Sequence, residues 1–225
     1  MCGRYSLSGS GGRQLQARFA LAEPPDLRPR YNIAPGTEVL AVRARPDGTR
    51  HAELLRWGLV PHWAKSPRAG QKMINARGET LRERPAYREA FKRRRCLIPA
   101  DGFYEWQRSP DGAGKQAHHI ARADGALFAF AGLWSVWHPE QPDELRSVTI
   151  VTTAATGKIA RIHDRMPVIL RPDEEALWLA SETPAGLLDG LLAGVTDEEL
   201  VVWAVGPEVG DPRFDGPQCL LERAA

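Results

Sequence analysis

Cys2 indicates a more specific reaction than any other residue in this sequence, because it directly follows the initiator Met1. Removal of Met1, which is usual before a small residue, leaves Cys2 with a free α-amine and a thiol. Such an aminothiol condenses with an aldehyde to an imine, and the thiol then closes a five-membered thiazolidine ring. Both groups titrate in a useful range, the amine near pKa ~7.7–8.0 and the thiol near ~8.5. The start of the chain therefore indicates covalent capture of an aldehyde.

A carboxyl group between aromatic residues is a second sign of chemistry. Glu105 lies between Tyr104 and Trp106 in a strand-like run. Apolar surroundings raise the pKa of a carboxyl group and let it carry protons near neutral pH. Two interpretations stay open for Glu105: a proton carrier in a site, or a solvated residue on the outer face of an edge strand.

Two further segments pair an arginine with a polar side chain two residues earlier. Asn75 and Arg77 point to the same side of an extended segment, which suits an amide that orients a polar group beside a phosphate. His163 and Arg165 follow the end of a predicted strand, where they can combine proton transfer with phosphate binding. Each segment also has an ordinary interpretation, in which these polar groups are solvated or structural.

Proline and tryptophan residues in predicted loops are candidates for stacking on nucleobases, which contributes about 1–3 kcal/mol per base. Pro35 lies in the loop at 31–36, and Trp63 lies in the segment 56–65. The basic run at 92–95 has two interpretations. It is either a track for phosphates or the solvated end of a helix, where the macrodipole favours cations.

The elements that must position these residues follow from turn and periodicity signals. Several β-prone runs are separated by Asp-Gly turns, and the predicted strands lie at 38–43, 52–58, 102–107, 117–122, 127–134 and 147–153. Helical periodicity occurs at 14–21, 86–94, 173–180 and 185–192. Strands dominate and turn back sharply, so we expect an α+β fold with mostly antiparallel sheets and short flanking helices.

Length and composition limit the class of protein. The 225 residues suffice for one well-filled domain or two small ones, and 43% hydrophobic with 26% charged residues is typical of a soluble globule. A net charge of +2 requires any basic surface to be local, and neither a membrane span nor a secretory signal is expected. Cys2, Cys96 and Cys219 lack metal-ligand spacing, so we expect free thiols, a cytoplasmic location and no metal or cofactor.

The motifs together resemble the SOS-response-associated peptidase (SRAP) family, whose members cross-link themselves to abasic sites in single-stranded DNA. The matching motifs are Met-Cys-Gly-Arg, Tyr-Asn-Ile-Ala-Pro-Gly, Trp-Gly-Leu-Val-Pro, Ile-Asn-Ala-Arg-Gly-Glu-Thr, Gly-Phe-Tyr-Glu-Trp and Ile-His-Asp-Arg-Met-Pro. The likeness covers nearly the whole chain and implies a single SRAP domain over residues 1–225. It also implies a compact, barrel-like, mostly antiparallel β core with short helices and a positively charged groove for DNA.

The resemblance implies a role for each matching residue. Cys2 becomes the cross-linking nucleophile, Asn75 holds Cys2 and the opened sugar, Glu105 carries protons and His163 helps to open the sugar ring. The residues that the resemblance assigns to DNA binding are the phosphate-binding Arg77 and Arg165, together with Arg4 and Thr152, and the wedging or stacking Pro35, Trp63 and Trp106.

The residues and the resemblance together predict a sensor that shields abasic sites by a thiazolidine cross-link, with lyase and peptidase activity as further expectations. His163 and Glu105 open the sugar, the α-amine of Cys2 attacks C1′ of the aldehyde, and the thiol closes the ring. We expect a monomer that binds single-stranded DNA through phosphates and stacking and associates with the nucleoid. Two alternatives stay open: a thiol peptidase or autopeptidase that uses Cys2, and a non-catalytic module that binds single-stranded DNA.

Overall fold

A closed barrel of five strands forms the centre of the computed structural model, which describes residues 2–9, 11–109, 112 and 114–223. The barrel strands are β3 (Glu38–Ala44), β4 (Arg50–Trp57), β6 (Arg95–Ala100), β9 (Phe128–Trp137) and β10 (Leu145–Ala154). Their order is β10-β4-β3-β6-β9, and pairing of β9 with β10 closes the ring. Only the β4–β10 pair within this ring is parallel. Closure protects the backbone edges that an open sheet exposes.

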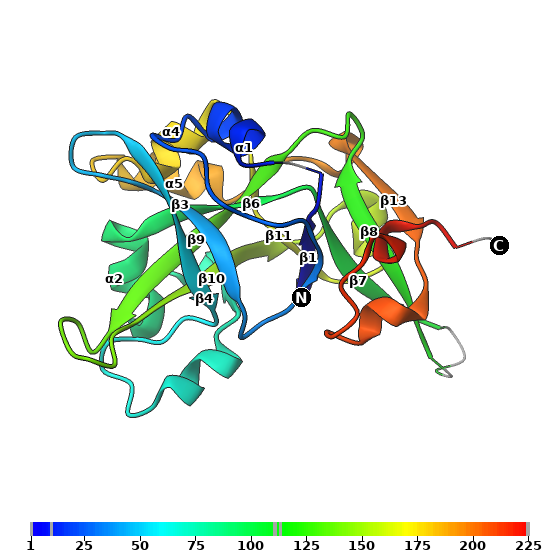
Figure 1. Cartoon of the computed structure of the whole chain (residues 1–225), viewed down its shortest axis with the longest axis horizontal. Helices are drawn as coiled ribbons and strands as arrows, with labels where there is room; N and C mark the ends of the chain where they lie inside the picture. The colour runs from blue at the N-terminus through cyan, green and yellow to red at the C-terminus, as the bar shows by residue number, and fades with distance from the viewer. Residues whose placement is uncertain (1, 10, 110–111, 113, 224–225) are drawn as a thin grey trace.

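A second, antiparallel sheet lies beside the barrel, on the right of Figure 1. Its strands, in spatial order, are β13 (Leu200–Ala204), β8 (Lys115–Arg122), β7 (Gly102–Arg108), β1 (Arg4–Leu7) and β2 (Arg30–Ile33). The chain passes from the barrel into this sheet at Asp101, the single residue between β6 and β7. The carboxylate of Asp101 accepts hydrogen bonds from Ser6 Oγ at 2.5 Å and from the backbone nitrogen of Gly9 at 2.8 Å. This corner therefore ties β1 to the junction of the two sheets.

Short elements complete the fold and confirm the expected α+β class. Strands β5 (Asn75–Arg77) and β11 (Arg165–Pro167) pair with β10, and β12 (Ile169–Leu170) pairs with β9. The helices are α1 (Gly12–Phe19), α2 (Pro85–Arg93), α3 (Gly157–Ala160), α4 (Glu174–Leu179) and α5 (Ala185–Leu191). The 3-10 turns are η1 (Pro67–Lys72), η2 (Gly78–Thr80), η3 (Asp197–Glu199), η4 (Pro207–Gly210) and η5 (Pro217–Leu220). Among the helices that the structure describes, none has the length and apolarity to cross a membrane.

An aromatic cluster fixes β1 against the barrel. The ring of Tyr5 meets Trp57 edge-on at 5.4 Å between centroids, and it meets Phe130 in the same way at 5.6 Å. Such edge-to-face pairs add about 0.5–1.5 kcal/mol to the free energy gained by burial. Tyr5 lies only three residues after Cys2, so the core holds the start of the described chain in a defined place.

The last residue of the basic run, Arg95, has a structural role. Its buried guanidinium donates to the backbone oxygens of Phe91 at 2.6 Å, Lys92 at 2.9 Å, Trp178 at 2.6 Å and Ala180 at 2.5 Å. These oxygens lie at the C-terminal ends of α2 and α4, where backbone carbonyls lack helical partners and favour a cation. Arg95 thus joins two helices to β6. Its contact with helix ends agrees with the macrodipole argument, but the expected solvated position is wrong for Arg95, because its side chain is buried.

Candidate active site

The start of β1 lies where the barrel meets the second sheet (Figure 1). Arg4 is paired with Tyr104 across β1 and β7. Because the two strands are antiparallel, the chain that precedes Arg4 runs past Glu105. From the barrel side, Nδ2 of Asn75 donates to the backbone oxygen of Cys2 at 2.8 Å. Residues from β1, β5 and β7 therefore converge on Cys2.

Asn75 is held by two neighbouring elements and keeps one hydrogen-bonding atom for a ligand. Its backbone oxygen accepts a hydrogen bond from the hydroxyl of Tyr87 on α2 at 3.2 Å, and its strand is paired with β10 at Ile150. Its buried Oδ1 has no hydrogen-bond partner among the residues that the structure describes. A buried acceptor without a donor costs about 1–3 kcal/mol, so this oxygen is suited to an incoming amine or hydroxyl.

The thiol of Cys2 is fully buried and donates a long hydrogen bond of 3.7 Å to the backbone oxygen of Arg4. Burial raises the pKa of this thiol, and the nearby charge of Glu105 raises it further. The resting group is therefore the thiol, which is a poor nucleophile compared with its thiolate. This setting suits chemistry in which another group attacks first and the sulfur reacts second. Met1, which the sequence predicts to be removed, lies outside the described residues.

Glu105 has the environment of a proton carrier. Its side chain on β7 is only 2% exposed, and burial raises its pKa to about 7. A carboxyl group with a pKa near neutrality is present in both protonation states at working pH, as general acid–base catalysis requires. The alternative interpretation, a solvated glutamate on an edge strand, is wrong because the residue is buried.

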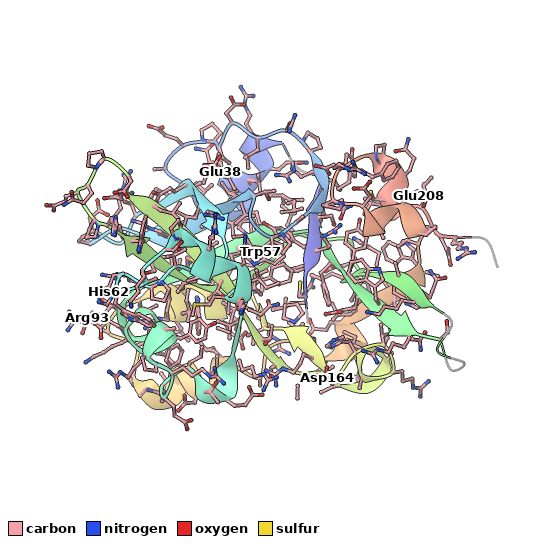
Figure 2. All side chains as sticks on the ribbon, turned by 90° about the horizontal axis from the view of Figure 1, so that it is seen from below. Glu38, Trp57, His62, Arg93, Asp164 and Glu208 are labelled. Atoms are coloured by element: carbon pink, nitrogen blue, oxygen red, sulfur yellow. The ribbon has the colours of Figure 1, made fainter. Side chains whose placement is uncertain are left out.

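His163 follows α3 and is partly open to solvent, with a side chain that is 28% exposed. Its Nδ1 accepts a hydrogen bond from the backbone nitrogen of Arg165 at 3.0 Å, and burial lowers its pKa. The ring is thus neutral near pH 7. Asp164, which Figure 2 places on the lower edge of the molecule, has Oδ1 2.8 Å from Nδ1 and forms an ion pair only when the ring is protonated.

Arg165 is positioned by the carboxylate of Glu79, for which the sequence predicts no role. Its two terminal nitrogens donate to the carboxylate of Glu79 at 2.5 and 2.9 Å, and one of them also donates to the backbone oxygen of Thr152 at 2.7 Å. These hydrogen bonds lower the pKa of Glu79, which is therefore ionised at neutral pH. Strand register pairs Thr152 with Arg77, so the two arginines flank the same residue of β10. Thr152 is fully buried, and its contact with DNA stays a prediction.

The residues predicted to stack or to contact phosphates differ in exposure. Arg77 is exposed, and the side chain of Trp63 is 55% exposed. Pro35 and Trp106 are half-buried, and Trp106 packs in part against a small core that contains Tyr104. A large exposed ring such as that of Trp63 suits stacking. The DNA contacts of these residues stay predictions.

Arg4 binds the protein's own backbone in this structure. Its Nη1 donates to Oδ1 of Asn32 at 2.9 Å and to the backbone oxygen of Val209 at 2.7 Å. Its Nη2 donates to the backbone oxygen of Gly210 at 3.1 Å. The guanidinium therefore joins β1 to β2 and η4, and a phosphate that binds Arg4 has to share or replace these partners.

The fold and the site define the class of this protein. The family model described as SOS response associated peptidase (SRAP) matches residues 1–212. The chain therefore belongs to the SRAP family, as the sequence motifs predict. A crystal structure of a protein from Bacteroides thetaiotaomicron has the same fold, with a TM-score of 0.87 over 99% of this chain and 100% of that chain at 23% identity.

Several similar chains carry the name abasic site processing protein. YoaM of Bacillus subtilis (strain 168) is 39% identical over 224 residues, which cover 98% of this chain and 97% of that protein. YedK of Escherichia coli (strain K12) is 36% identical over 187 residues, or 81% of each chain. HMCES of Gallus gallus is 30% identical over 264 residues, which cover 98% of this chain and 77% of that protein.

Proposed function

We propose that this protein processes abasic sites in single-stranded DNA by cross-linking itself to them through Cys2, with the whole chain acting as one SRAP domain. The observation that carries the proposal is the convergence of Asn75 and Glu105 on Cys2. Asn75 holds the backbone of Cys2 at 2.8 Å, and Glu105 is a buried carboxyl group with a pKa of about 7. The names of the relatives YoaM and YedK support the abasic site as the substrate.

The first chemical step opens the sugar. An abasic deoxyribose is mostly a closed hemiacetal, so its C1′ hydroxyl must lose a proton while the ring oxygen gains one. Glu105, with a pKa of about 7, and His163, whose ring is neutral near pH 7, are suited to share these transfers. The product of this step is the free aldehyde and a C4′ hydroxyl group.

The second and third steps form the two bonds to C1′. The unprotonated α-amine of Cys2 attacks the aldehyde, and protonated Glu105 assists loss of the hydroxyl group as water, which leaves an imine. The thiol then adds to the imine carbon, and its proton passes to the nitrogen. The buried thiol of Cys2 is suited to this late role, since it stays protonated until the electrophile is next to it. The unpaired Oδ1 of Asn75 is suited to accept a hydrogen bond from the amine or the opened sugar.

The structural setting of Cys2 disfavours the two alternatives. A thiol peptidase needs a thiolate nucleophile, whereas burial and the charge of Glu105 both raise the pKa of this thiol. A module that only binds DNA has no use for a buried carboxyl group with a pKa of about 7, because that group weakens folding at neutral pH. Cross-linking explains both features.

Replacement of Cys2 by alanine tests the proposal directly. Cys2→Ala is expected to keep DNA binding and to form only a labile imine, because the amine remains but no thiol can close the ring. Borohydride reduction should trap this adduct, and heating without reduction should release it, as read on a denaturing gel. Cys219→Ala, which removes another buried cysteine, is the matched control and should cross-link like the wild type. A heat-stable adduct from unreduced Cys2→Ala would remove the thiazolidine from the mechanism.

The arginines near the site are expected to bind phosphates without reading sequence. Arg77→Ala and Arg165→Ala should each weaken binding to any single-stranded DNA and lower the slope of log affinity against log salt by about 0.7. Glu79→Gln should act in the opposite direction, because it releases the guanidinium of Arg165 from its ion pair. Affinities measured over a salt series for random and abasic strands provide the test. A loss confined to one base sequence contradicts this assignment.

A further inference from the structure

A cavity with a volume of about 440 Å³ lies between α2 and the segment that enters α5. Its walls include the basic side chains of Arg82, Arg88 and Lys92, and its apolar part is formed by Phe91 and Leu188. Every charged side chain that lines it is basic. Such a combination suits a ligand with an anionic group joined to an apolar ring.

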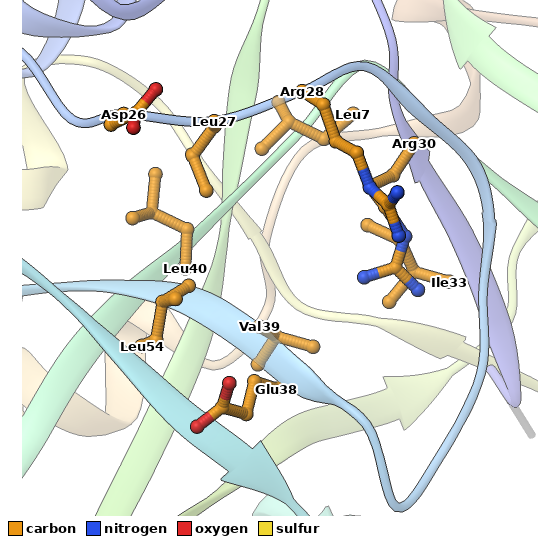
Figure 3. A pocket seen from close by; sticks show the side chains of 10 residues that line it. All are labelled: Leu7, Asp26, Leu27, Arg28, Arg30, Ile33, Glu38, Val39, Leu40 and Leu54. Carbon is orange, nitrogen blue, oxygen red and sulfur yellow. The ribbon is translucent and has the colours of Figure 1, made fainter.

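The cavity shown in Figure 3 provides a contrast within the same molecule. It has a volume of about 230 Å³, and its two arginines are balanced by Asp26 and Glu38. Arg30 is also paired with Asp215 at 2.8 Å, which leaves only Arg28 without an ion-pair partner in the described chain. The cavity of Figure 3 therefore has no preference for anions, whereas the cavity beside α2 has one.

The cations beside α2 are available to a ligand. Arg88 and Lys92 are four residues apart on the exposed side of α2, and neither forms an ion pair with any residue that the structure describes. Arg82 is already oriented, because its guanidinium lies 5.0 Å from the ring centre of Phe91 and binds Asp189 at 2.8 Å. A planar guanidinium over an aromatic ring provides a surface on which a nucleobase can stack.

One wall of this cavity is bonded to the strand that carries Asn75, and the end of the other wall lies beside the residue that follows this strand. Tyr87, one residue before Arg88, donates its hydroxyl hydrogen to the backbone oxygen of Asn75 at 3.2 Å. The end of α5 abuts the residue after Arg77, since a Cβ placed on Gly78 would lie 3.6 Å from Cβ of Leu192. The cavity is therefore one helix away from the candidate active site.

We propose that this cavity is a nucleotide subsite, with the base stacked on the guanidinium of Arg82, which itself covers the ring of Phe91, and the phosphate between Arg88 and Lys92. Two cations on successive helical turns can contact one phosphate or two neighbouring ones. The nucleotide that binds here belongs either to the DNA strand beside the abasic site or to the pool of free nucleotides, which have the same chemistry. The first of these sources rests on the proposed function. The subsite extends the DNA path from Arg77 along α2.

The test uses strands that contain a tetrahydrofuran abasic analogue, which has no aldehyde and cannot cross-link. Strands of three to nine nucleotides are extended on either the 5′ or the 3′ side, and their affinities are measured over a salt series. The Arg88→Gln/Lys92→Gln variant is compared with Arg13→Gln/Arg28→Gln, which removes the same charge from exposed positions outside this cavity. Ala185→Trp, at the exposed mouth of the cavity, blocks the space without changing charge.

In the wild type, extension on one side is expected to raise affinity. Arg88→Gln/Lys92→Gln should lose about 5- to 10-fold of that gain and lower the salt slope by about 0.7, the value for the one phosphate held between them. Ala185→Trp should lose the gain as well, and Arg13→Gln/Arg28→Gln should keep it. In a second arm, the binding of dTMP is measured. If affinity does not depend on strand length, but dTMP binds the wild type and not Arg88→Gln/Lys92→Gln, the subsite is assigned to free nucleotides.

The proposal is overturned if neither strand extension nor dTMP binding depends on Arg88 and Lys92. Its failure is separable from failure of the proposed function, because a three-nucleotide strand with a true abasic site tests cross-linking without reaching the cavity. Cross-linking of that strand by the wild type, together with identical affinities for all variants, rejects the subsite alone.

Discussion

A chain with one glycine inserted between Met1 and Cys2 is expected to form no heat-stable adduct with abasic single-stranded DNA. The insertion turns the α-nitrogen of Cys2 into an amide, which has no basic lone pair and cannot form an imine. The thiol remains, but any imine forms on the new terminal amine, one residue away, so the thiol cannot close a five-membered ring on it. The inserted residue also enlarges the chain beside a residue that is fully buried, at the place where the opened sugar must enter. Retention of Met1 should have the same effect.

The measurement combines the intact mass of each preparation with a denaturing gel of its adduct. The same glycine added after Ala225 is the matched control and should leave cross-linking unchanged. Robust cross-linking by a chain whose mass still includes Met1 would show that Cys2 does not act as an aminothiol.

Glu105→Gln is expected to slow cross-linking by about 10²-fold or more, the usual scale for loss of a general acid or base. Glutamine keeps the size of the side chain but cannot exchange a proton near neutral pH. DNA affinity should change little, because Glu105 is buried. Single-turnover rates on an abasic strand provide the measurement. The control is Glu208→Gln, at an exposed position that Figure 2 shows away from Asp164. Equal rates for wild type and Glu105→Gln would contradict the role of Glu105 as proton carrier.

The same substitution is expected to stabilise the protein at neutral and higher pH. Burial raises the pKa of Glu105 to about 7 in the folded state, whereas an unfolded glutamate has a pKa near ~4.3. Between these values the folded state binds a proton that the unfolded state lacks, so stability falls as pH rises toward 7. The free energy of unfolding of Glu105→Gln should therefore exceed that of the wild type by about 1–3 kcal/mol above pH 7 and approach it near pH 4. Denaturant unfolding across this pH range measures the difference.

The opposite directions of these two effects separate catalysis from folding. A structural role alone predicts that loss of Glu105 changes stability and affinity together, with little effect on the chemical step. A proton carrier held in an unfavourable environment predicts a slower reaction in a more stable protein. Loss of stability in Glu105→Gln at pH 8 contradicts this interpretation of its burial.

The sequence by itself determined the chemical groups and most of the elements that carry them. Turn signals and periodicity depend on near neighbours, so the sequence predicts a helix at 86–94, and α2 spans Pro85–Arg93. The strand predicted at 102–107 is likewise found at Gly102–Arg108. The aminothiol of Cys2 needs only its position after Met1, and the order of the motifs was enough to indicate the SRAP family.

Tertiary structure alone decided which groups meet and how they titrate. The hydrogen bond from Asn75 to Cys2 joins residues 73 positions apart. The hydroxyl of Tyr87 donates to the backbone oxygen of Asn75, a contact that no sequence motif indicates. The carboxylate of Glu79 became the partner of Arg165 only when β5, β10 and β11 assembled. The pKa of Glu105 depends on desolvation by segments distant in the chain, which no local pattern records. Local sequence thus determines the reactive groups, and packing determines their protonation and their partners.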